Sequence, residues 1–537
     1  MFLKKVEIEK YKHFEKTNFP LVFTIASKNG GGKTTMLQFI FTILHCFTKE
    51  SKKVYIKNVL GNLTDIESEK KLAKFIIEDN NENYTLEFLI APAESPERNF
   101  NLFLDLEETD KKVQKHKRIN KKSRAILELK KEVDDSERIT PLLEKDLRDI
   151  AEEFIKNPTD RRLYREARIS NDIEAYKKLL NSIIDSNYFS PDSANELESI
   201  YYSIQEKIKN LKSFLKEDNL SYITHLLNVK TVLLLKSNMP EDLLEKLSNK
   251  IFLTTPSSQI FLFLSEEQKA NIFYDLSKEK NSFRSYDDNV QSAKKALNGF
   301  FTYDFASTDL ILESFEKAFQ KDRVKKLKTG EYGAYYDELV EEFRNFLEGK
   351  EILVDENFEK VIFKQNSIEL SPEDLSHGEL KKLSIYIWLK HFVEPESIIL
   401  MDEVDIALHP TWQYKIINDL TSWSQNSQFL LATHSPQILS STYYKNLIKL
   451  TVDNSKVEAE RYSQPPVDRD INAIITTIME SPDFPEELLE LHKKYRKLIR
   501  DGKIDTEEAK KLKNQILEYE SENSAFFQDI HFDLELL

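Results

Sequence analysis

The sequence predicts a mixed α/β protein whose sheet domain is built from both ends of the chain. Three observations support this prediction. A glycine cluster typical of a phosphate-binding loop follows an apolar strand near the N-terminus, at residues 27–34. Two further apolar strands, at 397–403 and 428–434, end in polar side chains far later in the chain. Long charged stretches between these motifs, and again at the C-terminal end, favour helices.

The pattern of strands and helices divides the chain into four segments. Alternating apolar residues and the glycine cluster place the N-terminal part of a nucleotide-binding lobe at 1–107. Charged stretches with scattered Leu and Ile predict a helical insertion at 108–250. Strand character returns in 251–466, which we expect to form the remainder of the head. Apolar residues at helical spacing predict a helical C-terminal extension at 467–537.

Shorter elements are predicted inside these segments from alternating or continuous apolar runs. We expect strands at 74–78 and 84–90, and another at 260–263. A hairpin is expected to join 352–354 to 361–363. In the sequence, these elements lie between the glycine cluster and the later motifs. We expect them to form part of the scaffold that holds any site.

Composition excludes several classes of protein. With 537 residues, 40% hydrophobic and 31% charged, the chain fits a soluble globular protein with a large helical fraction. No apolar run is long enough to span a bilayer, and Lys4, Lys5 and Glu7 occupy positions where a signal peptide needs apolar residues. The single cysteine, Cys46, excludes an internal disulfide framework and a Cys-x-x-Cys metal hook. We therefore expect a cytoplasmic protein that does not contact membranes.

The formal net charge of −15 argues against a surface that binds phosphate backbones broadly. One local exception runs from Lys111 to Arg124, where eight basic residues occur without an acid. A solvated helix or loop is the simpler interpretation of this 111–124 run. Contact with nucleic acid or with a protein partner is the alternative.

Residues 27–34 read Ser-Lys-Asn-Gly-Gly-Gly-Lys-Thr and fit a phosphate-binding loop, except that Ser27 stands where glycine is usual. In such a loop, consecutive backbone N–H groups surround a β-phosphate at the positive end of a helix. Lys33 would reach the β- and γ-phosphates, and the Thr34 hydroxyl would bind Mg²⁺. An ordinary glycine turn is the alternative. The residues expected to bind the nucleotide are Asn29, Gly30, Gly31, Gly32, Lys33, Thr34 and Thr35.

The apolar run 397–401 is followed by two acids. Asp402, at the end of the predicted strand, would hold the Mg²⁺ shell, and Glu403 would polarise the attacking water. Apolar strands that end in Asp-Glu are common, so this pair alone does not identify a nucleotide site. The motif that precedes it in the chain makes the assignment more specific.

That preceding motif, residues 375–382, has a Leu-Ser-x-Gly-Glu pattern directly before a predicted helix. The Ser376 hydroxyl and the Gly378 amide at a helix N-terminus, with Glu379 in the first turn, would form a γ-phosphate receptor. Within one chain this receptor would have no phosphate to bind, so we expect it to act on ATP held by a partner copy. A serine cap with a glutamate in the first turn is the alternative.

A further apolar strand, 428–432, leads into Thr433-His434-Ser435. His434 would contact the γ-phosphate, and a structural histidine is the alternative. Residues 405–410, between the acids and this histidine, would form a loop that crosses a dimer interface. The four motifs occur in the order that an ABC-type ATPase requires. They predict a two-lobed ABC-type P-loop ATPase head that binds ATP and Mg²⁺ and uses Lys33, Glu403 and His434 in catalysis.

These motifs resemble those of ABC ATPases of the SMC, RecF and overcoming-lysogenisation-defect lineage. Within that lineage, 407–413 and 432–437 are similar to stand-alone ATPases of bacterial antiviral defence islands. Residues 468–475 and the helical hairpin after them resemble the tail of the Septu ATPase subunit, PtuA. The resemblance implies head-to-tail ATP sandwiches, a homodimer or higher homo-oligomer, and a separate HNH nuclease partner.

The resemblance also implies roles for three residues outside the main motifs. Gln259 would be the glutamine that senses Mg²⁺ between the lobes, with a plain loop glutamine as the alternative. Phe14 would pack near the adenine, although a hydrophobic strand residue explains it nearly as well. His409 stands where transporter ATPases carry an aspartate.

Three functions from different classes remain open at this point. The preferred one is a regulatory ATPase of an antiviral, Septu-like complex that controls a nuclease partner. The second is a DNA-repair or chromosome-maintenance ATPase that clamps DNA directly. The third is a nucleotide-binding scaffold that hydrolyses ATP weakly, which the departure at Ser27 keeps open. A fused TOPRIM nuclease is not expected, because only a short and mainly helical stretch follows Pro436.

Overall fold

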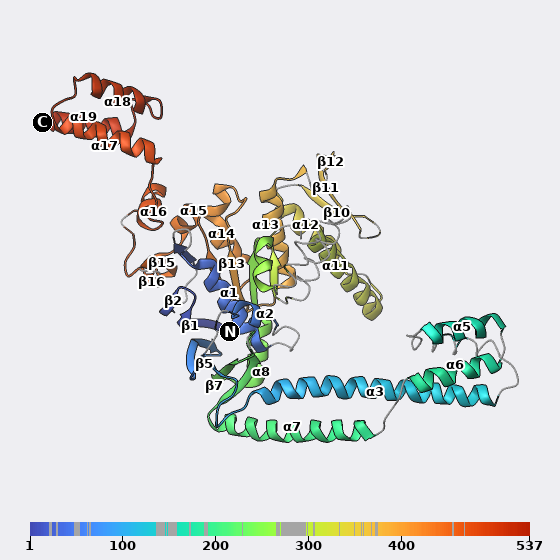
Figure 1. The fold of residues 1–537 in the computed structure, drawn as a ribbon. Coiled ribbons are helices and arrows are strands. Elements are labelled where there is room, and N and C mark those ends of the chain that lie inside the picture. The colour runs from blue at the N-terminus through green and yellow to red at the C-terminus, as the bar shows by residue number, and fades with distance from the viewer. Residues whose placement is uncertain are drawn as a thin grey trace. The chain divides into compact units, whose positions relative to one another are not determined.

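The computed structural model covers residues 1–537 and describes two compact units, one formed by 1–90, 223–228 and 233–537 and the other by 91–222 and 229–232 (Figure 1). The following residues lie outside the described part of the chain: 21–23, 28–30, 48–53, 62, 64–65, 136–144, 146–147, 149–157, 171–172, 187–191, 228, 265–268, 270–296, 298, 304–306, 332, 348–349, 356, 358, 367, 371–373, 454–455, 467 and 537. Among the described helices, none combines the length and the apolarity that crossing a bilayer requires.

The larger unit is built on one large sheet, in which both ends of the chain take part. Within the described residues, its thirteen strands run in the order β6 (Leu220–His225), β7 (Thr231–Ser237), β5 (Glu82–Pro92), β4 (Lys70–Asp79), β1 (Phe2–Tyr11), β2 (Phe14–Pro20), β16 (Lys456–Arg461), β15 (Leu447–Asp453), β3 (Thr24–Ser27), β14 (Gln428–Ala432), β13 (Ile398–Asp402), β8 (Ile251–Thr255) and β9 (Phe300–Thr302).

Two kinds of pairing divide this sheet. The strands β15, β3, β14, β13, β8 and β9 pair in parallel, whereas β1, β2, β4 and β5 form antiparallel pairs. All five residues of β13 are buried, as expected for a parallel strand covered on both faces. Carboxyl ends of parallel strands meet at one edge of a sheet, so the polar residues after β3, β13 and β14 are brought to the same edge.

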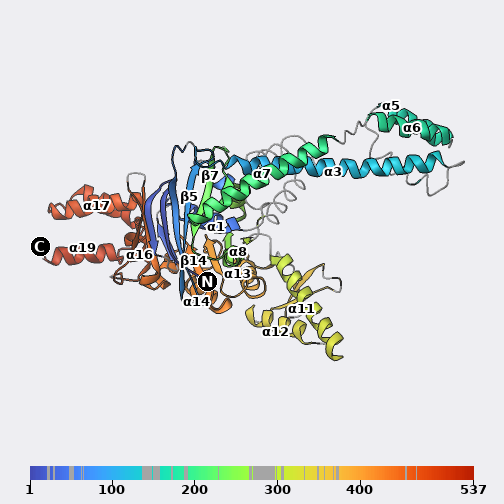
Figure 2. The ribbon, with the colours of Figure 1, turned by 90° about the horizontal axis from the view of Figure 1, so that it is seen from below.

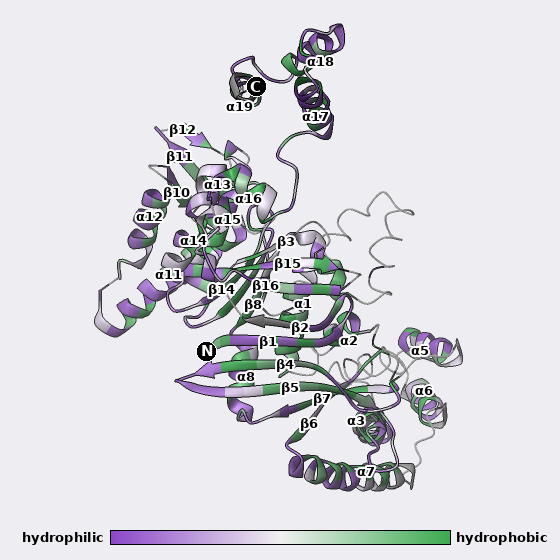
Figure 3. Ribbon diagram, turned by 90° about the vertical axis from the view of Figure 1, so that its left-hand side faces the viewer, coloured by the Kyte–Doolittle hydropathy of each residue, from purple (hydrophilic) through white to green (hydrophobic). Residues whose placement is uncertain are grey.

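The antiparallel part was predicted well because its signals are local. The strands expected at 74–78 and 84–90 are β4 and β5, joined by a tight turn at Asn80 and Asn81. Both turn residues have left-handed φ angles, of 50° and 67°, which asparagine tolerates better than most residues. Figure 3 shows the middle of both strands as hydrophobic and their turn ends as hydrophilic.

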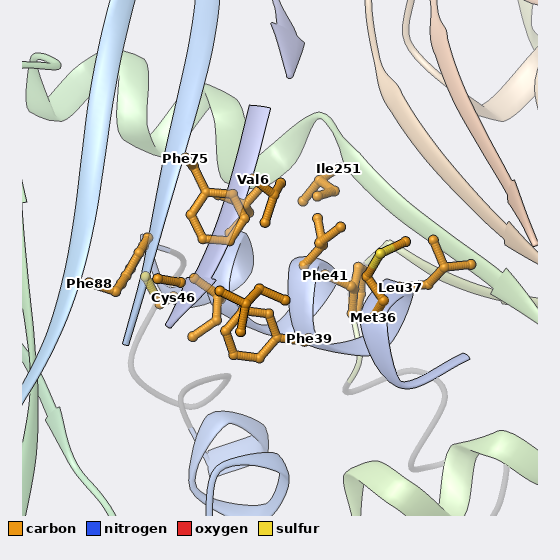
Figure 4. Packing of buried hydrophobic residues seen from close by; sticks show 14 of the residues in the cluster. Val6, Met36, Leu37, Phe39, Phe41, Cys46, Phe75, Phe88 and Ile251 are labelled. Atoms are coloured by element: carbon orange, nitrogen blue, oxygen red, sulfur yellow. The ribbon is translucent and has the colours of Figure 1, made fainter. Parts of the chain in front are cut away.

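Helix α1 (Lys33–Leu44) begins directly after the glycine cluster and is apolar on nearly every side. Its side chains Met36, Leu37, Phe39 and Phe41 belong to the main core cluster together with strand residues such as Phe75 (Figure 4). A helix that is hydrophobic all round is a buried core helix. The start of α1 is therefore held rigidly against the sheet.

A second core belongs to the segment that carries the Leu-Ser-x-Gly-Glu motif. It is formed by helices and a small sheet, and includes Ile311, Phe343, Ile352 and Leu383. The predicted hairpin is present, because β10 pairs antiparallel with β11. The elements concerned are α11 (Ser307–Thr329), α12 (Tyr335–Phe346), β10 (Glu351–Val354), β11 (Val361–Gln365), β12 (Ile368–Leu370), α13 (His377–Ile387) and η6 (Trp388–Phe392).

The smaller unit is largely helical. In it α3 (Asn101–Asp134) packs along α7 (Asp192–Glu217), as both ribbon views show (Figure 2), and α5 (Pro158–Ser170) packs on α6 (Ile173–Ser186). The 111–124 basic run lies on α3. Of its described side chains, Lys111 pairs with Glu107 at 2.8 Å and Lys117 with Glu198 at 3.3 Å, and all four are exposed. These exposed ion pairs support the interpretation of this part of the run as a solvated helix.

The C-terminal extension is helical, and its helices are α16 (Ile471–Thr477), α17 (Glu486–Arg500), α18 (Glu507–Leu517) and α19 (Ala525–Leu536). The last three share a small core of their own that includes Leu488, Tyr495, Ile516 and Phe527. The apolar spacing in this part of the sequence therefore predicted its helices correctly.

The structure differs from the sequence-based expectation in two elements. Strands β6 and β7 lie inside 108–250, which was expected to be helical; the run Val232-Leu233-Leu234-Leu235 is a short, continuously buried strand. The strand expected at 260–263 is instead part of the 3₁₀ helix η3 (Ser257–Phe263). Its buried residues Ile260 and Phe263 are three apart, which is the period of that helix.

Candidate nucleotide-binding site

Gly32 lies directly before α1 in a backbone conformation that other residues rarely adopt. Gly32 has a φ of 87°, and a Cβ atom there would lie 2.9 Å from the ring of Phe14. Only glycine suits both the left-handed angle and the close approach. Asn29 and Gly30, both predicted to bind phosphate, lie outside the described residues, whereas Gly31 is described and buried.

Helix α1 starts without a side-chain cap and without an acid in its first turn. The backbone N–H groups of that turn, which includes Thr34 and Thr35, have no intrahelical partner, and they lie at the positive end of the helix dipole. Such an end favours an anion, and phosphate is the group that a glycine-rich loop before a helix usually holds.

Lys33 is the buried cation of the site, with 5% of its surface exposed. Burial lowers the pKa of its ammonium to about 8, and the carboxylates of Asp402, Asp405 and Glu403 partly oppose that shift. A buried ammonium close to acids on β13 and the loop after it is costly unless it has a function or a close partner. Phosphate oxygens would favour its charged form.

Asp402 ends β13 and is 2% exposed. Burial raises the pKa of its carboxyl group, while hydrogen bonds from Thr34 and Gln259 and the charge of Lys33 lower it. Gln259 Nε2 donates to Asp402 Oδ2 at 2.8 Å, and Gln38 Nε2 donates to Gln259 Oε1 at 3.1 Å. The structure therefore places Gln259, from η3, beside the carboxylate and not in an unconnected loop.

Glu403 follows Asp402 in a strained backbone conformation, with a φ of 52°. Its N–H donates to the carbonyl of Ala432 at 3.0 Å, which ties the loop to the end of β14. Burial raises the pKa of the Glu403 carboxyl group, and the negative charges of Asp402 and Asp405 raise it further. A raised pKa suits a general base, and left-handed non-glycine residues concentrate at functional sites.

The turn after β14 is bonded to the loop that contains Asp405. Thr433 Oγ1 donates to Asp405 Oδ1 at 2.6 Å, and Ser435 Oγ donates to Gln413 Oε1 at 2.6 Å. His434 lies between these two contacts in the chain. Burial, and then the charge of Lys33, lower the pKa of His434, which favours its neutral imidazole. A neutral imidazole can donate or accept a hydrogen bond toward phosphate.

The Leu-Ser-x-Gly-Glu motif starts α13 with a capping box. Ser376 Oγ accepts from the Glu379 N–H at 3.2 Å, and Glu379 Oε2 accepts from the Ser376 N–H at 3.1 Å. Ser376 is nevertheless exposed, so a second molecule can approach it. A Cβ atom on buried Gly378 would lie 2.7 Å from the carbonyl oxygen of Ala407, so glycine is needed for α13 to pack on this loop.

Two residues considered from the resemblance have structural roles here. Phe14 is 1% exposed and packs against Gly32 in the core, so the interpretation as a core strand residue is the one the structure supports. His409 caps α14 (Pro410–Trp423), because its Nδ1 accepts from the Thr411 N–H at 3.3 Å.

Sequence reasoning missed Lys381 on α13 and Tyr303 after β9. Lys381 is 6% exposed, and its Nζ lies 4.0 Å from the centre of the Tyr303 ring. Tyr303 accepts a hydrogen bond from Thr254 at 2.9 Å and is buried near the acids of the site. The sequence gives no signal for Lys381, because α13 also carries Glu379 and Lys382 in the same stretch.

The oxygen groups gathered here suit magnesium bound together with a nucleotide. Mg²⁺ prefers hard oxygen ligands and is usually held by one or two carboxylates plus phosphates. Asp402 supplies one carboxylate, and Thr34 and Gln259 add a hydroxyl and an amide. Within the described residues, no group of three or more His, Cys, Asp or Glu side chains forms a cage for a metal alone.

The large sheet and the helices around it confirm the predicted mixed α/β fold class. Residues 28–440 match the family described as "AAA domain, putative AbiEii toxin, Type IV TA system". The match covers most of the chain, and the chain belongs to this family.

Individual relatives match shorter parts of this chain than the family does. The retron Vc95 probable ATPase of Vibrio cholerae is 28% identical over 164 residues, which cover 28% of this chain and 32% of the relative. The Septu protein PtuA of Bacillus thuringiensis is 38% identical over 58 residues, or 11% of this chain and 15% of that protein. The match spans less than a third of the length of either relative. The SMC head domain of Thermotoga maritima is 10% identical, with a TM-score of 0.34 over 86% of this chain and all of that domain.

The lowered pKa of Lys33 predicts a pH dependence of ATP affinity. Above pH 8, Lys33 in the ligand-free protein loses its proton, and ATP binding must restore it. Affinity is therefore full below pH 8 and falls as pH rises, by at most about tenfold per unit. Titration of a fluorescent ATP analogue between pH 7 and 9.5 measures the effect. Lys33→Arg, whose guanidinium stays charged, is expected to flatten the profile, and parallel profiles for both proteins would contradict the assignment.

Proposed function

We propose that the chain is an ATP-binding and ATP-hydrolysing subunit whose copies close head to tail around ATP. The observation that carries the proposal is the convergence of Lys33 from α1, Asp402 from β13 and His434 after β14 at the carboxyl ends of neighbouring strands. Each interacts electrostatically with at least one of the others, although they lie far apart in the sequence. Family membership supports the same conclusion.

Each group in this site has a proposed task. Lys33 and the first turn of α1 hold the phosphates, while Asp402, Thr34 and Gln259 hold Mg²⁺, which when bound supplies charge stabilisation at the reacting phosphate. Glu403 accepts a proton from the attacking water, and His434 contacts the terminal phosphate.

The second copy completes the site in this proposal. Ser376 is exposed at the N-terminus of α13, where its hydroxyl and the nearby backbone N–H groups can bind a phosphate that another chain presents. Closure of two copies would then depend on ATP, because the phosphate is the group that both chains contact.

The larger role that we propose is control of a separate HNH nuclease in a Septu-like antiviral complex. Its support is the similarity to proteins named as retron probable ATPases and as Septu PtuA. Direct clamping of DNA through the 111–124 run receives no support from the described part of α3, where Lys111, Lys112 and Lys117 each pair with a glutamate.

Purification of the tagged chain from its native host tests the nuclease proposal. Glu403→Gln is expected to stay in the closed, ATP-bound form, and Lys33→Ala is expected to stay open. The two variants therefore represent the two extreme nucleotide states of the protein. We expect a small HNH-type nuclease in fixed stoichiometry, with its amount or activity differing between the variants. Recovery of DNA and repair factors, or of the ATPase alone from both variants, would contradict the nuclease proposal.

A further inference from the structure

Lys381 lies on α13, five residues after Ser376, but its side chain points to the loop after β13. Its Nζ donates to the carbonyl oxygens of Glu403 at 3.2 Å and of Ile406 at 2.6 Å. The ring of Tyr303 lies 4.0 Å from the same ammonium group. One buried cation therefore bonds the backbone of the residue assigned as the general base.

The loop after β13, to which Lys381 donates its hydrogen bonds, contains unfavourable backbone angles. Glu403 and Ala407 have left-handed φ angles of 52° and 63°, which are unfavourable for residues other than glycine. Carbonyl oxygens that point inward need donors, since an unpaired buried carbonyl costs about 1–3 kcal/mol. Lys381 supplies two donors at once, and Tyr303, fixed by Thr254, shields it from water.

We propose that Lys381 is a positioning residue for Glu403 of its own chain, and so serves the ATP that its own chain binds. This assignment separates two functions on one helix. Ser376 at the start of α13 faces a second copy, whereas Lys381 acts on the site of the same chain. The inference rests on the proposed function, in which the start of α13 acts on the partner's ATP.

Single variants give the first test. Lys381→Met keeps the length of the side chain but removes the charge and the donors. We expect kcat for ATP to fall about 10- to 100-fold, a fraction of the effect of a general base, while KM changes less than threefold. Lys381→Arg should restore part of kcat. Lys382→Met is the matched control, because the next lysine forms an ion pair with Asp419 at 3.8 Å instead and lies only partly buried.

The comparison of kcat with KM supplies a readout that a merely structural role would not give. Lys381→Met should lower kcat while KM and the melting temperature stay close to wild type, and Lys382→Met should change none of the three. A fall in kcat that comes with a lowered melting temperature and weaker ATP binding would show that Lys381 supports packing only, and would overturn the proposal.

Mixed dimers give the decisive test. Two differently tagged chains are co-expressed and dimers are purified through both tags. With Lys381→Met and Glu403→Gln on the same chain and a wild-type partner, one site is damaged twice and the other is intact, so in a single turnover about half of the bound ATP should be hydrolysed at the wild-type rate. With the two substitutions on different chains, each site carries one lesion, and activity should fall to near that of Lys381→Met alone or below.

The reverse pattern would overturn the proposal, because it would mean that Lys381 acts through Ser376 on the partner's ATP. The proposed function fails in a distinguishable way: the wild-type chain would then show no ATP hydrolysis or no ATP-dependent dimer. In that case the mixed-dimer experiment would show no difference between wild type and Glu403→Gln, before Lys381 is tested at all.

Discussion

Replacement of Glu403 by glutamine is expected to lower kcat for ATP at least 100-fold while ATP binding stays within a few fold of wild type. Glutamine has nearly the same shape but cannot accept the proton of the attacking water, and a general base contributes about 10²–10⁴ in rate. Because hydrolysis no longer opens the closed form, dimers should persist in ATP. Single-turnover kinetics and gel filtration with ATP measure the two effects.

The pH dependence adds a second expectation for the same residue. The pKa of Glu403 is raised, so wild-type activity should be full at higher pH and be lost as pH falls through that pKa. The residual activity of Glu403→Gln should lack this acid limb. Asp419→Asn is the control, since burial also raises the pKa of that acid on α14. Wild-type turnover in Glu403→Gln would show that another group is the base.

Replacement of Ser376 by arginine is expected to abolish ATP-dependent dimers and reduce hydrolysis at least 100-fold. Ser376 is exposed at the start of α13, and arginine there would fill the space that a second chain's phosphate needs. Binding of ATP to a single chain should change less than threefold, because in the proposed site the phosphates are held by Lys33 and α1. Analytical ultracentrifugation with and without ATP separates the two properties.

Loss of the cap must be distinguished from the added bulk. Ser376→Ala removes the hydroxyl that accepts from the Glu379 N–H, which costs about 1 kcal/mol of helix stability, but adds nothing at the surface. We expect it to dimerise more weakly than wild type and more strongly than Ser376→Arg. Normal dimers and normal hydrolysis in Ser376→Arg would show that the Leu-Ser-x-Gly-Glu motif is only a helix cap.

Local chemistry explains which parts of the site the sequence predicts. The glycine loop, the acids after β13 and the serine before α13 each depend on short-range rules: left-handed angles, the edge of a parallel sheet and a helix cap. Only a family resemblance suggested a role for Gln259 beside the proposed magnesium ligands, and that role stays a prediction. The structure adds its contact with Asp402 across 143 positions of the chain.

The remainder could not be predicted because it depends on three-dimensional contacts with no local signal. Lys381 is part of an ordinary helical pattern until Glu403 and Ile406 are placed beside it. Strand β7 is a short apolar run, and such runs do not distinguish a buried strand from a helix by periodicity. At 257–263, a spacing of three residues favoured a 3₁₀ helix over a strand.

The order of strands in the sheet has a consequence for synthesis of the protein. Strand β3, which lies before the glycine cluster, pairs with β14 and β15 in the described sheet, and these strands lie at residues 428–432 and 447–453. Leu3 likewise bonds Gln428, 425 positions away. Until residues 428–453 have been synthesised, β3 therefore lacks its partner strands. In a fragment without them the proposed ATP site would not be assembled, so ATP could not stabilise that fragment.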